Sequence, residues 1–134
     1  MSNLRGRSRW GALGLAGIAA AAAPVLALAV PEALAKLEPG RWQLRHSDGA
    51  DARSLCLADP AMLVQLEHHG ASCGQELLAS GAGAATVEYS CPGRGFGRTS
   101  IRVETPRLAR IDTQGLADGR PFAYRVEARR VGAC

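Results

Sequence analysis

Residues 99–128 read TSIRVETPRLARIDTQGLADGRPFAYRVEA, and this stretch decides the fold class. Near its start, Ile101 and Val103 alternate with charged side chains, which is the period of two residues typical of a β-strand. The alternation returns at residues 108–113 and 122–128, after segments rich in the turn residues Pro, Gly and Asp. Successive strands with one apolar and one polar face predict an antiparallel sheet.

The same pattern extends toward the N-terminus. Residues 41–46 alternate polar and bulky side chains, and residues 54–57 are predicted as a short strand. Residues 75–79 and 86–89 flank a glycine-containing turn and predict a hairpin. We therefore predict a mainly β (α+β) fold, a curved antiparallel meander of about six to seven strands with one short helix and two disulfides. Its predicted core is Trp42, Leu44, Val87, Tyr89, Ile101, Val103, Phe122, Tyr124 and Val126.

A single helix is predicted at residues 61–67. Asp59 is a favourable N-cap, Pro60 suits the first helical position, and Gly70 is placed to end the helix. We expect it to pack at one end of the sheet or across its concave side. We expect His68 and the next histidine to be solvated at its C-terminal end, where a positive charge suits the helix dipole.

The four cysteines allow three pairings. An even number of cysteines predicts a disulfide framework in a short chain that leaves the reducing cytosol. The midpoint of Cys73 and Cys91 falls inside the predicted glycine turn, so a symmetric hairpin sets these two opposite each other. Cys56 and Cys134 then pair by elimination. No CxxC motif occurs, and the cysteine spacings match no zinc pattern.

The first 35 residues predict a cleaved signal peptide, followed by a single disulfide-stapled β-rich domain at residues 36–134. Three arginines precede an uncharged, Ala- and Leu-rich run from residue 10 to 30. Ala33-Leu34-Ala35 is the favoured small-x-small cleavage triplet, and Ala27-Leu28-Ala29 is an alternative that the sequence leaves open. An uncleaved membrane anchor is the competing interpretation, which the many Ala and Gly residues and a central proline disfavour. We expect a periplasmic or secreted protein with no stable membrane span after cleavage.

The charge of the chain does not indicate nucleic-acid binding. The whole chain has 16 basic and 12 acidic side chains. Removing the leader leaves 13 basic and 11 acidic ones, a net charge of about +2. Because the remaining basic residues are interspersed with acidic ones, we expect no nucleic-acid partner.

Four segments of the mature part resemble a known bacterial family. They are Pro39-Gly40-Arg41-Trp42, the residues LCLADP at 55–60, Tyr89-Ser90-Cys91, and RRVGAC at 129–134. Together they resemble the exported family catalogued as domain of unknown function 3617, over about residues 37–134. The resemblance implies a Gram-negative periplasmic setting and carries over no activity, cofactor or catalytic residue.

The best candidate recognition site is the segment PGRGFGR at 92–98. Arg94, Phe96 and Arg98 place an aromatic ring between two arginines on a predicted exposed, glycine-rich connection. The segment lacks the Lys-Ser/Thr ending of a phosphate-binding loop. We expect no metal site, because the two adjacent histidines at 68 and 69 point in different directions on a helix and Cys73 is predicted to be oxidised.

Catalysis is not predicted. No histidine has a nucleophile motif beside it. Glu88, Glu104 and Glu127 occupy outward strand positions between arginines, where cross-strand ion pairs are expected.

The sequence leaves three classes of function: a binding domain, an inhibitor and an enzyme. We favour a non-catalytic exported domain that binds a protein partner or an envelope component, without a cofactor. The alternatives are an inhibitor of an extracellular hydrolase and a carrier of a small apolar ligand, which few aromatic residues are available to enclose. An enzyme would require a cleft holding a carboxylate or histidine with a strongly shifted pKa.

Overall fold

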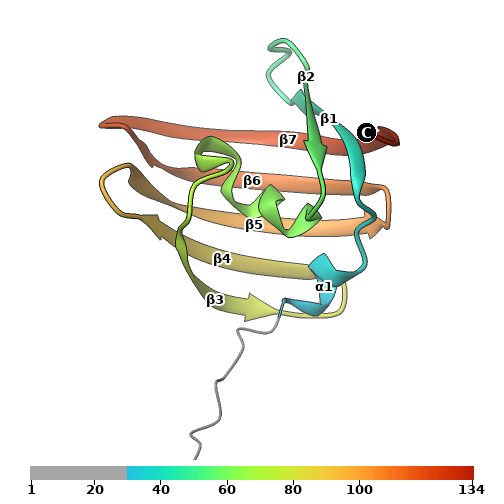
Figure 1. Ribbon diagram of the computed structural model, residues 1–134, viewed down its shortest axis with the longest axis horizontal. Helices are drawn as coiled ribbons and strands as arrows, with labels where there is room; N and C mark the ends of the chain where they lie inside the picture. Colours follow the sequence, from blue (N-terminus) through green and yellow to red (C-terminus); the bar gives the residue numbers. More distant parts are fainter. Residues whose placement is uncertain (1–29) are drawn as a thin grey trace, which may run out of the picture.

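A single seven-stranded antiparallel sheet organises the chain. The computed structural model describes residues 30–134, so most of the predicted leader lies outside the described residues. The strand order is β2-β1-β7-β6-β5-β4-β3 (Figure 1). The elements are α1 (Glu32–Ala35), β1 (Gly40–His46), β2 (Arg53–Leu57), η1 (Pro60–His68), β3 (Gly74–Ser80), β4 (Ala84–Cys91), β5 (Gly95–Thr105), β6 (Leu108–Ala117) and β7 (Arg120–Gly132). The predicted fold class is confirmed.

The period-two pattern sorts side chains onto two faces of the sheet. On the inner face, Ile101, Ile111 and Val126 form one cross-strand row and are almost completely buried. Trp42 and Leu44 of β1 are fully buried beside them. Of the predicted core, six side chains are buried, and Val103, Phe122 and Tyr124 are half-buried.

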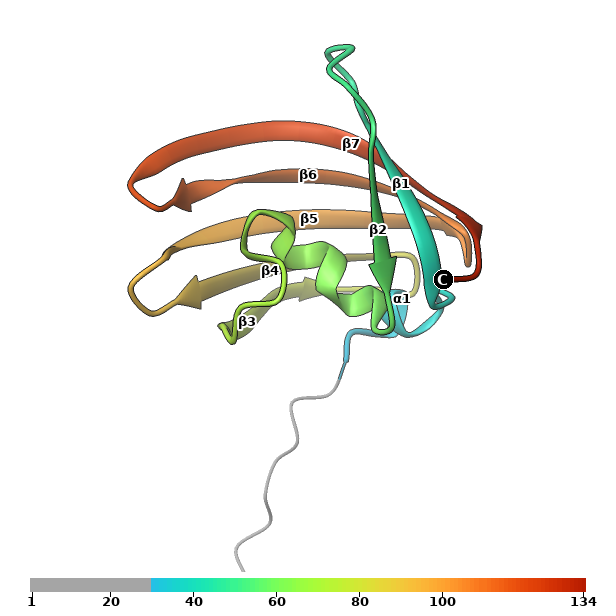
Figure 2. The same cartoon turned by 45° about the horizontal axis from the view of Figure 1, so that its top comes forward.

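The N-terminal hairpin and the 3-10 helix cover the inner face. In Figures 1 and 2, β1 and β2 run steeply across the ends of the long strands, and η1 lies in front of the sheet beside β2. Leu63, Val64 and Leu66 of η1 join the core cluster, which explains why the curved sheet is filled on this side. The sequence analysis omitted these three side chains from the predicted core.

The predicted helix is present but has a different geometry. It is a 3-10 helix rather than an α-helix, and it is interrupted at Gln65, whose backbone is non-helical. Asp59 caps it as expected, accepting a hydrogen bond from the amide of Ala61 at 2.9 Å. The kink turns the last part of η1 toward the sheet, so His68 is fully buried instead of solvated. The sequence analysis predicted that both His68 and His69 are exposed, and of these two only His69 is.

The glycine-rich segment is a strand rather than a connecting loop. Only Pro92-Gly93-Arg94 forms the turn, and β5 begins at Gly95. A Cβ on Gly95 would meet the backbone of Leu116, and one on Gly97 would lie 2.5 Å from the Tyr89 ring. These glycines therefore admit close neighbours on the inner face, which is why a Gly-rich sequence is compatible with a central strand here.

Two disulfides fasten the ends of the fold. Cys73 and Cys91 are bonded with a Cα–Cα distance of 4.3 Å. They extend the register of the β3–β4 hairpin, in which Gly74 pairs with Ser90. Cys56 and Cys134 are bonded with a Cα–Cα distance of 5.8 Å and tie the edge strand β2 to the C-terminus. The predicted pairing is therefore the one present.

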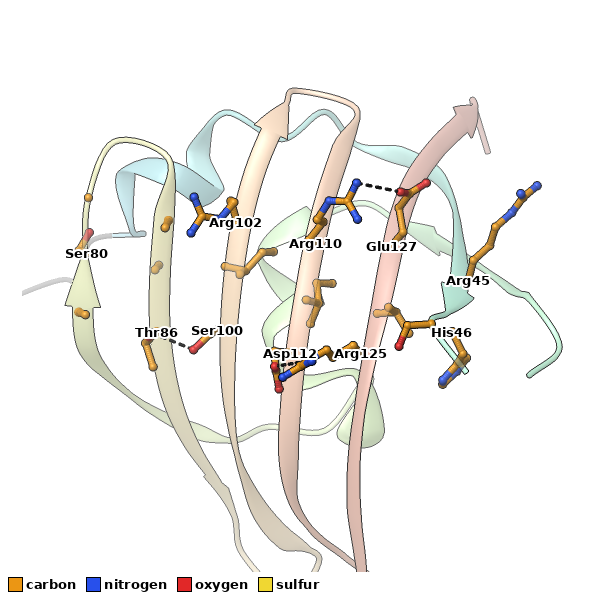
Figure 3. Close-up of a pocket in the computed structure, with 18 residues that line it drawn as sticks. Arg45, His46, Ser80, Thr86, Ser100, Arg102, Arg110, Asp112, Arg125 and Glu127 are labelled. Atoms are coloured by element: carbon orange, nitrogen blue, oxygen red, sulfur yellow. Dashed lines mark hydrogen bonds and ion pairs between the residues drawn. The ribbon is translucent and has the colours of Figure 1, made fainter. Parts of the chain in front are cut away.

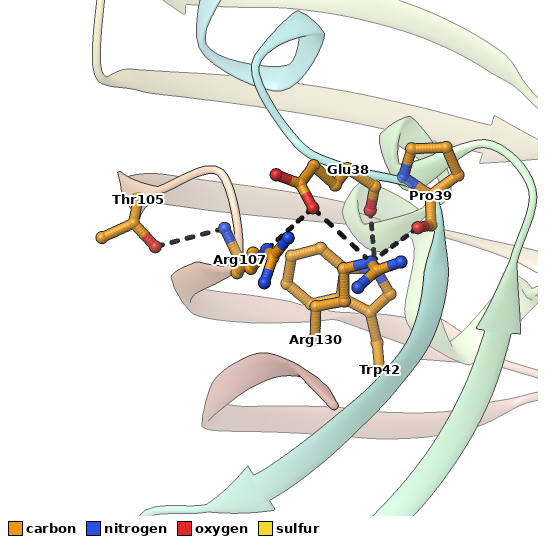
Figure 4. Close-up of polar contacts among 6 residues, drawn as sticks. All are labelled: Glu38, Pro39, Trp42, Thr105, Arg107 and Arg130. Atoms are coloured by element: carbon orange, nitrogen blue, oxygen red, sulfur yellow. Dashed lines mark hydrogen bonds and ion pairs between the residues drawn. The ribbon is translucent and has the colours of Figure 1, made fainter. Parts of the chain in front are cut away.

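The segment before β1 is fastened to the C-terminal part of β7 and to the β5–β6 turn. Figure 4 shows the Trp42 indole donating to the carbonyl of Glu38 at 3.0 Å, while Arg107 contacts the Glu38 carboxylate at 2.8 Å. Arg130 donates to the carbonyl of Pro39 at 2.7 Å. Gly40, at φ 144°, has no room for a side chain because a Cβ would collide with the Gly132 carbonyl. The Pro-Gly-Arg-Trp motif is therefore a structural clamp.

A second short helix, α1, is present where the sequence analysis predicted one helix only. It falls on the last residues that were assigned to the leader. Within residues 30–134, no helix is long and apolar enough to cross a membrane.

Candidate binding surface

The predicted recognition residues lie at one end of the outer face of the sheet. Phe96 and Arg98 alternate with glycines on β5, and Phe96 is 53% exposed. Arg98 makes an ion pair with Glu88 at 2.8 Å, as expected for cross-strand neighbours. Phe96 and Arg98 line a small depression of about 420 Å³ with residues of β6. Arg94 lies in the adjoining turn, 3.7 Å from Asp118.

A larger hollow lies on the same face, toward the other end of the strands. Its volume is about 800 Å³, within the usual range for small-molecule sites. It extends across the sheet from the end of β3 to the end of β1, on the face opposite η1 and α1 (Figure 3). The side chains of Ile101, Ile111 and Val126 point into the core on the other face. The backbone of this row therefore forms the floor of the hollow. Polar side chains of the neighbouring rows form its walls.

One wall of this hollow is an arginine-rich row. The register places Arg102 of β5 opposite Arg110 of β6, which faces Glu127 of β7, which in turn faces Arg45 of β1. At the β4 end of this row, Ala84 is paired with Arg102. Because adjacent strands lie about 4.8 Å apart, the backbones of Arg102 and Arg110 are direct neighbours. The row therefore runs from a small apolar residue to a basic centre.

The charges of the hollow are only partly compensated. Arg110 contacts Glu104 at 2.6 Å and Glu127 at 3.6 Å, and its pKa is raised by the hydrogen bond to Glu104 and then by the carboxylate charges. Arg125 and Asp112 are paired at 2.6 Å in the next row. Among residues 30–134, neither Arg102 nor Arg45 forms an ion pair. Like charges directly opposite each other destabilise a sheet, so the Arg102–Arg110 neighbours favour an anion between them.

The opposite end of the hollow is lined by small side chains. Ala79, Ala84 and Gly81 surround it where β3 turns into β4. Figure 3 shows the labelled charged side chains on β5, β6, β7 and β1, with Ser80 and Thr86 on the β3–β4 side. The hollow therefore offers a small-residue end and a basic end, which is the arrangement that suits an amphiphilic anion.

The inner face contains a polar cluster that holds η1 on the sheet. Glu67 accepts a hydrogen bond from the Tyr124 hydroxyl at 2.6 Å and lies 3.5 Å from Arg53. The pKa of Tyr124 is raised by burial and then by this hydrogen bond. The His46 ring lies 4.9 Å from the Tyr124 ring. Glu67 is thus engaged by two partners.

His68 also has two hydrogen-bonding partners, one on β4 and one in the turn before β5. Its Nδ1 lies 3.3 Å from the Tyr89 hydroxyl, and its Nε2 lies 3.1 Å from the carbonyl of Arg94. Burial, and to a smaller extent the charge of Glu67, raises the pKa of Tyr89 to about 12. The His68-His69-Cys73 group that the sequence analysis weighed as a metal site is separated by these contacts and by the disulfide. Residues 30–134 contain no group of three or more His, Cys, Asp or Glu side chains arranged to hold a metal ion.

Comparisons with known proteins assign no family, because no family model, no curated protein and no solved structure matches the chain. The resemblance to domain of unknown function 3617 therefore stays a prediction.

The sequence analysis did not identify the large hollow. Its basic row joins residues from four strands, which only the cross-strand register brings together. The available signal was the placing of arginines at outward positions 102, 110 and 125 of successive strands.

Proposed function

We propose that this protein is an exported, non-catalytic binding domain whose outer sheet face holds an anionic, amphiphilic component of the bacterial envelope. The observation that carries the proposal is Arg102, which has no acidic partner among the described residues and lies beside Arg110 in the hollow. A phosphate or carboxylate group would pair with the Arg102 guanidinium and would share Arg110 with Glu104 and Glu127. The apolar part of the ligand would lie against Ala79 and Ala84.

The non-catalytic part of the proposal rests on how the titratable groups are used. Glu67 is bound by Tyr124 and Arg53, and both ring nitrogens of His68 have partners. These groups hold η1 against the sheet, and a general base must be free to reach a substrate proton. The carboxylates of the hollow, Asp112 and Glu127, are each paired with arginine.

Export is supported by two features. The disulfides fit a compartment outside the reducing cytosol. The N-terminal sequence has the charge and hydrophobicity pattern of a signal peptide. A periplasmic location is the setting in which an envelope component is available as ligand.

Calorimetric titration with dihexanoyl phosphatidylglycerol, kept below its micellar concentration, tests the proposed binding. Dihexanoyl phosphatidylcholine is the neutral-headgroup control, and inorganic phosphate tests whether the anion alone is sufficient. We expect the anionic lipid to bind at least tenfold more tightly than the zwitterionic one. We expect Arg102→Gln to weaken it about tenfold, the effect of losing about 1.4 kcal/mol of charge-assisted hydrogen bonding.

Arg120→Gln is the matched control, because Arg120 is an exposed arginine at the β6–β7 turn and does not line the hollow. It should leave the affinity unchanged. Equal weakening by both substitutions would mean that only the total positive charge matters and would contradict a site at Arg102. Tight binding of inorganic phosphate would identify an anion site without a role for the apolar end. No binding of any of the probes would contradict the proposal.

A second candidate is an inhibitor of an extracellular hydrolase, which the β1–β2 hairpin favours. Its tip projects beyond the sheet in both views (Figures 1 and 2), and residues 47–52 are all exposed. Asp48 accepts a hydrogen bond from the amide of Ala50 at 3.0 Å and shapes the turn. A projecting loop is suited to block an active-site cleft. Inhibition of secreted proteases that is lost when residues 48–51 are replaced by Gly-Ser would support it.

A further inference from the structure

We infer that the leader is cleaved after Ala29, so that the mature protein begins at Val30 and keeps α1 as part of its core. This inference rests on the export included in the proposed function. Two triplets, Ala27-Leu28-Ala29 and Ala33-Leu34-Ala35, satisfy the small-x-small requirement of signal peptidase. The peptidase acts before the exported chain folds. The two possible cleavages therefore differ in which residues remain in the mature chain that folds.

The second triplet forms part of the hydrophobic core. Ala33 is 0% exposed and Leu34 is 3% exposed, and both belong to α1. Leu34 is a member of the same core cluster as Leu37 and Trp42. The helix contacts β4, β5 and η1, which makes it a link between the sheet and the 3-10 helix. Cleavage after Ala35 would remove Leu34 and leave a gap among buried apolar side chains.

The backbone of this segment is also built into the fold. The amides of Leu34 and Ala35 donate to the carbonyl of Pro31, at 2.9 and 3.1 Å. Lys36 reaches the carbonyl of Ala82 in the β3–β4 turn and lies 3.5 Å from Glu32. The amide of Glu38 donates to the carbonyl of Pro106 in the β5–β6 turn at 2.9 Å. Residues 31–38 thus close the end of the sheet at two of its turns.

The first triplet leaves all of these contacts intact. Cleavage after Ala29 places the new N-terminus at Val30, which is 55% exposed, one residue before the Pro31 carbonyl that begins α1. A free, charged amino group at that position remains in water and requires no buried partner. The geometry therefore favours a mature chain that begins at Val30 over one that begins at Lys36.

The test is the mature N-terminus of the full-length precursor, exported to the periplasm of a Gram-negative host and measured by intact mass and N-terminal sequencing. We expect a chain beginning at Val30. A chain beginning at Lys36 would overturn the inference and leave export standing. An intact leader would overturn both the inference and the proposed export.

Two matched variants separate the cleavage sites. Ala29→Asp places a charge at the position before the first site and should abolish the product that begins at Val30. Ala35→Asp does the same at the second site, and Ala35 is exposed, so the fold should tolerate it. We expect Ala35→Asp to be processed at Val30 like the parent protein. Loss of processing in Ala35→Asp but not in Ala29→Asp would overturn the inference.

A stability measurement tests the role of α1 independently. In the mature protein, Leu34→Ala should lower the urea midpoint clearly, whereas Glu32→Ala, at an exposed position of the same helix, should leave it unchanged. Equal midpoints for the two variants would show that α1 is not part of the stable domain and would overturn the structural basis of the inference.

Discussion

The two faces of the same seven strands differ in what their side chains contact. On the inner face, Trp42 of β1 and Ile101 of β5 belong to the core cluster that also includes residues of η1, and both side chains are almost completely buried. On the outer face, Arg102 follows Ile101 on β5 and Arg125 precedes the buried Val126 on β7, and both arginines remain in water. The comparison teaches that one period-two pattern provides both stability and a recognition surface. Substitutions on the two faces should therefore have separable effects.

The largest expected effect is the loss of the Trp42 side chain. Trp42 is 0% exposed, and its indole also donates to the carbonyl of Glu38. Trp42→Ala should lower the free energy of unfolding by about 3–5 kcal/mol, because it removes a large buried ring and leaves a cavity. Arg41→Ala, the outward neighbour on β1, is the control and should change it by less than about 0.5 kcal/mol. Urea unfolding measures both, and similar losses would contradict the division between faces.

A smaller loss is expected for Gly97→Ala, which adds one methyl group to the inner face of β5. The new Cβ would lie 2.5 Å from atoms of the buried Tyr89 ring, so the ring or the strand must move. We expect a loss of about 1–3 kcal/mol in urea unfolding. Gly93→Ala is not a suitable comparison because Gly93 has a positive φ of 74°. Ser100→Ala, on the outer face of the same strand, is the control. An unchanged midpoint for Gly97→Ala would contradict the close packing of Tyr89.

The Tyr89 hydroxyl should make the stability of the folded protein sensitive to alkaline pH. Its pKa is raised to about 12 in the folded protein, mainly by burial, against 10 in the unfolded chain. The folded state therefore keeps a proton that the unfolded state releases, so stability is complete below pH 10 and falls as the pH rises from 10 toward 12. With an allowance for solvent screening, the loss is on the order of 1–2 kcal/mol.

Urea midpoints between pH 9 and pH 11.5 measure this loss. Tyr89→Phe removes the titrating group, so it should show a smaller decline over the same pH range, with the remainder due to Tyr124. An identical decline in the two proteins would mean that Tyr89 does not ionise with unfolding.

The smallest effect is expected on the outer face. Arg125 and Asp112 form a short ion pair, but both side chains are more than half exposed, where water and salt screen the interaction. Arg125→Gln should leave the urea midpoint within experimental error at physiological salt. A loss comparable to that of Gly97→Ala would mean that the outer face contributes to the fold as the inner face does.

The sequence predicted those features that depend on neighbours along the chain. Alternation at residues 99–128 indicated the strands, and the symmetry of the hairpin around residue 82 indicated the Cys73–Cys91 bond. The missed features depend on partners far away in sequence. His68 was expected in solvent because a regular helix was assumed, whereas the kink at Gln65 and the missing side chain of Gly95 admit it to the core.

The candidate site was the least predictable part. The exposed positions of Phe96 and Arg98 followed from composition, and they do lie on the outer face. The larger hollow could not be predicted because a one-residue change in the β5–β6 register would separate Arg102 from Arg110. The role of α1 was missed because its Ala-Leu-Ala sequence satisfies both a cleavage signal and a buried helix turn.

The most direct test of the account is a map of backbone amide NMR shifts during titration with dihexanoyl phosphatidylglycerol. The account predicts that the largest shifts occur at residues 100–102 and 110–112, in the floor and walls of the hollow, with little change in η1. Shifts confined to the hairpin tip at residues 47–52, or spread through the inner face, would contradict the assignment of binding to the outer face.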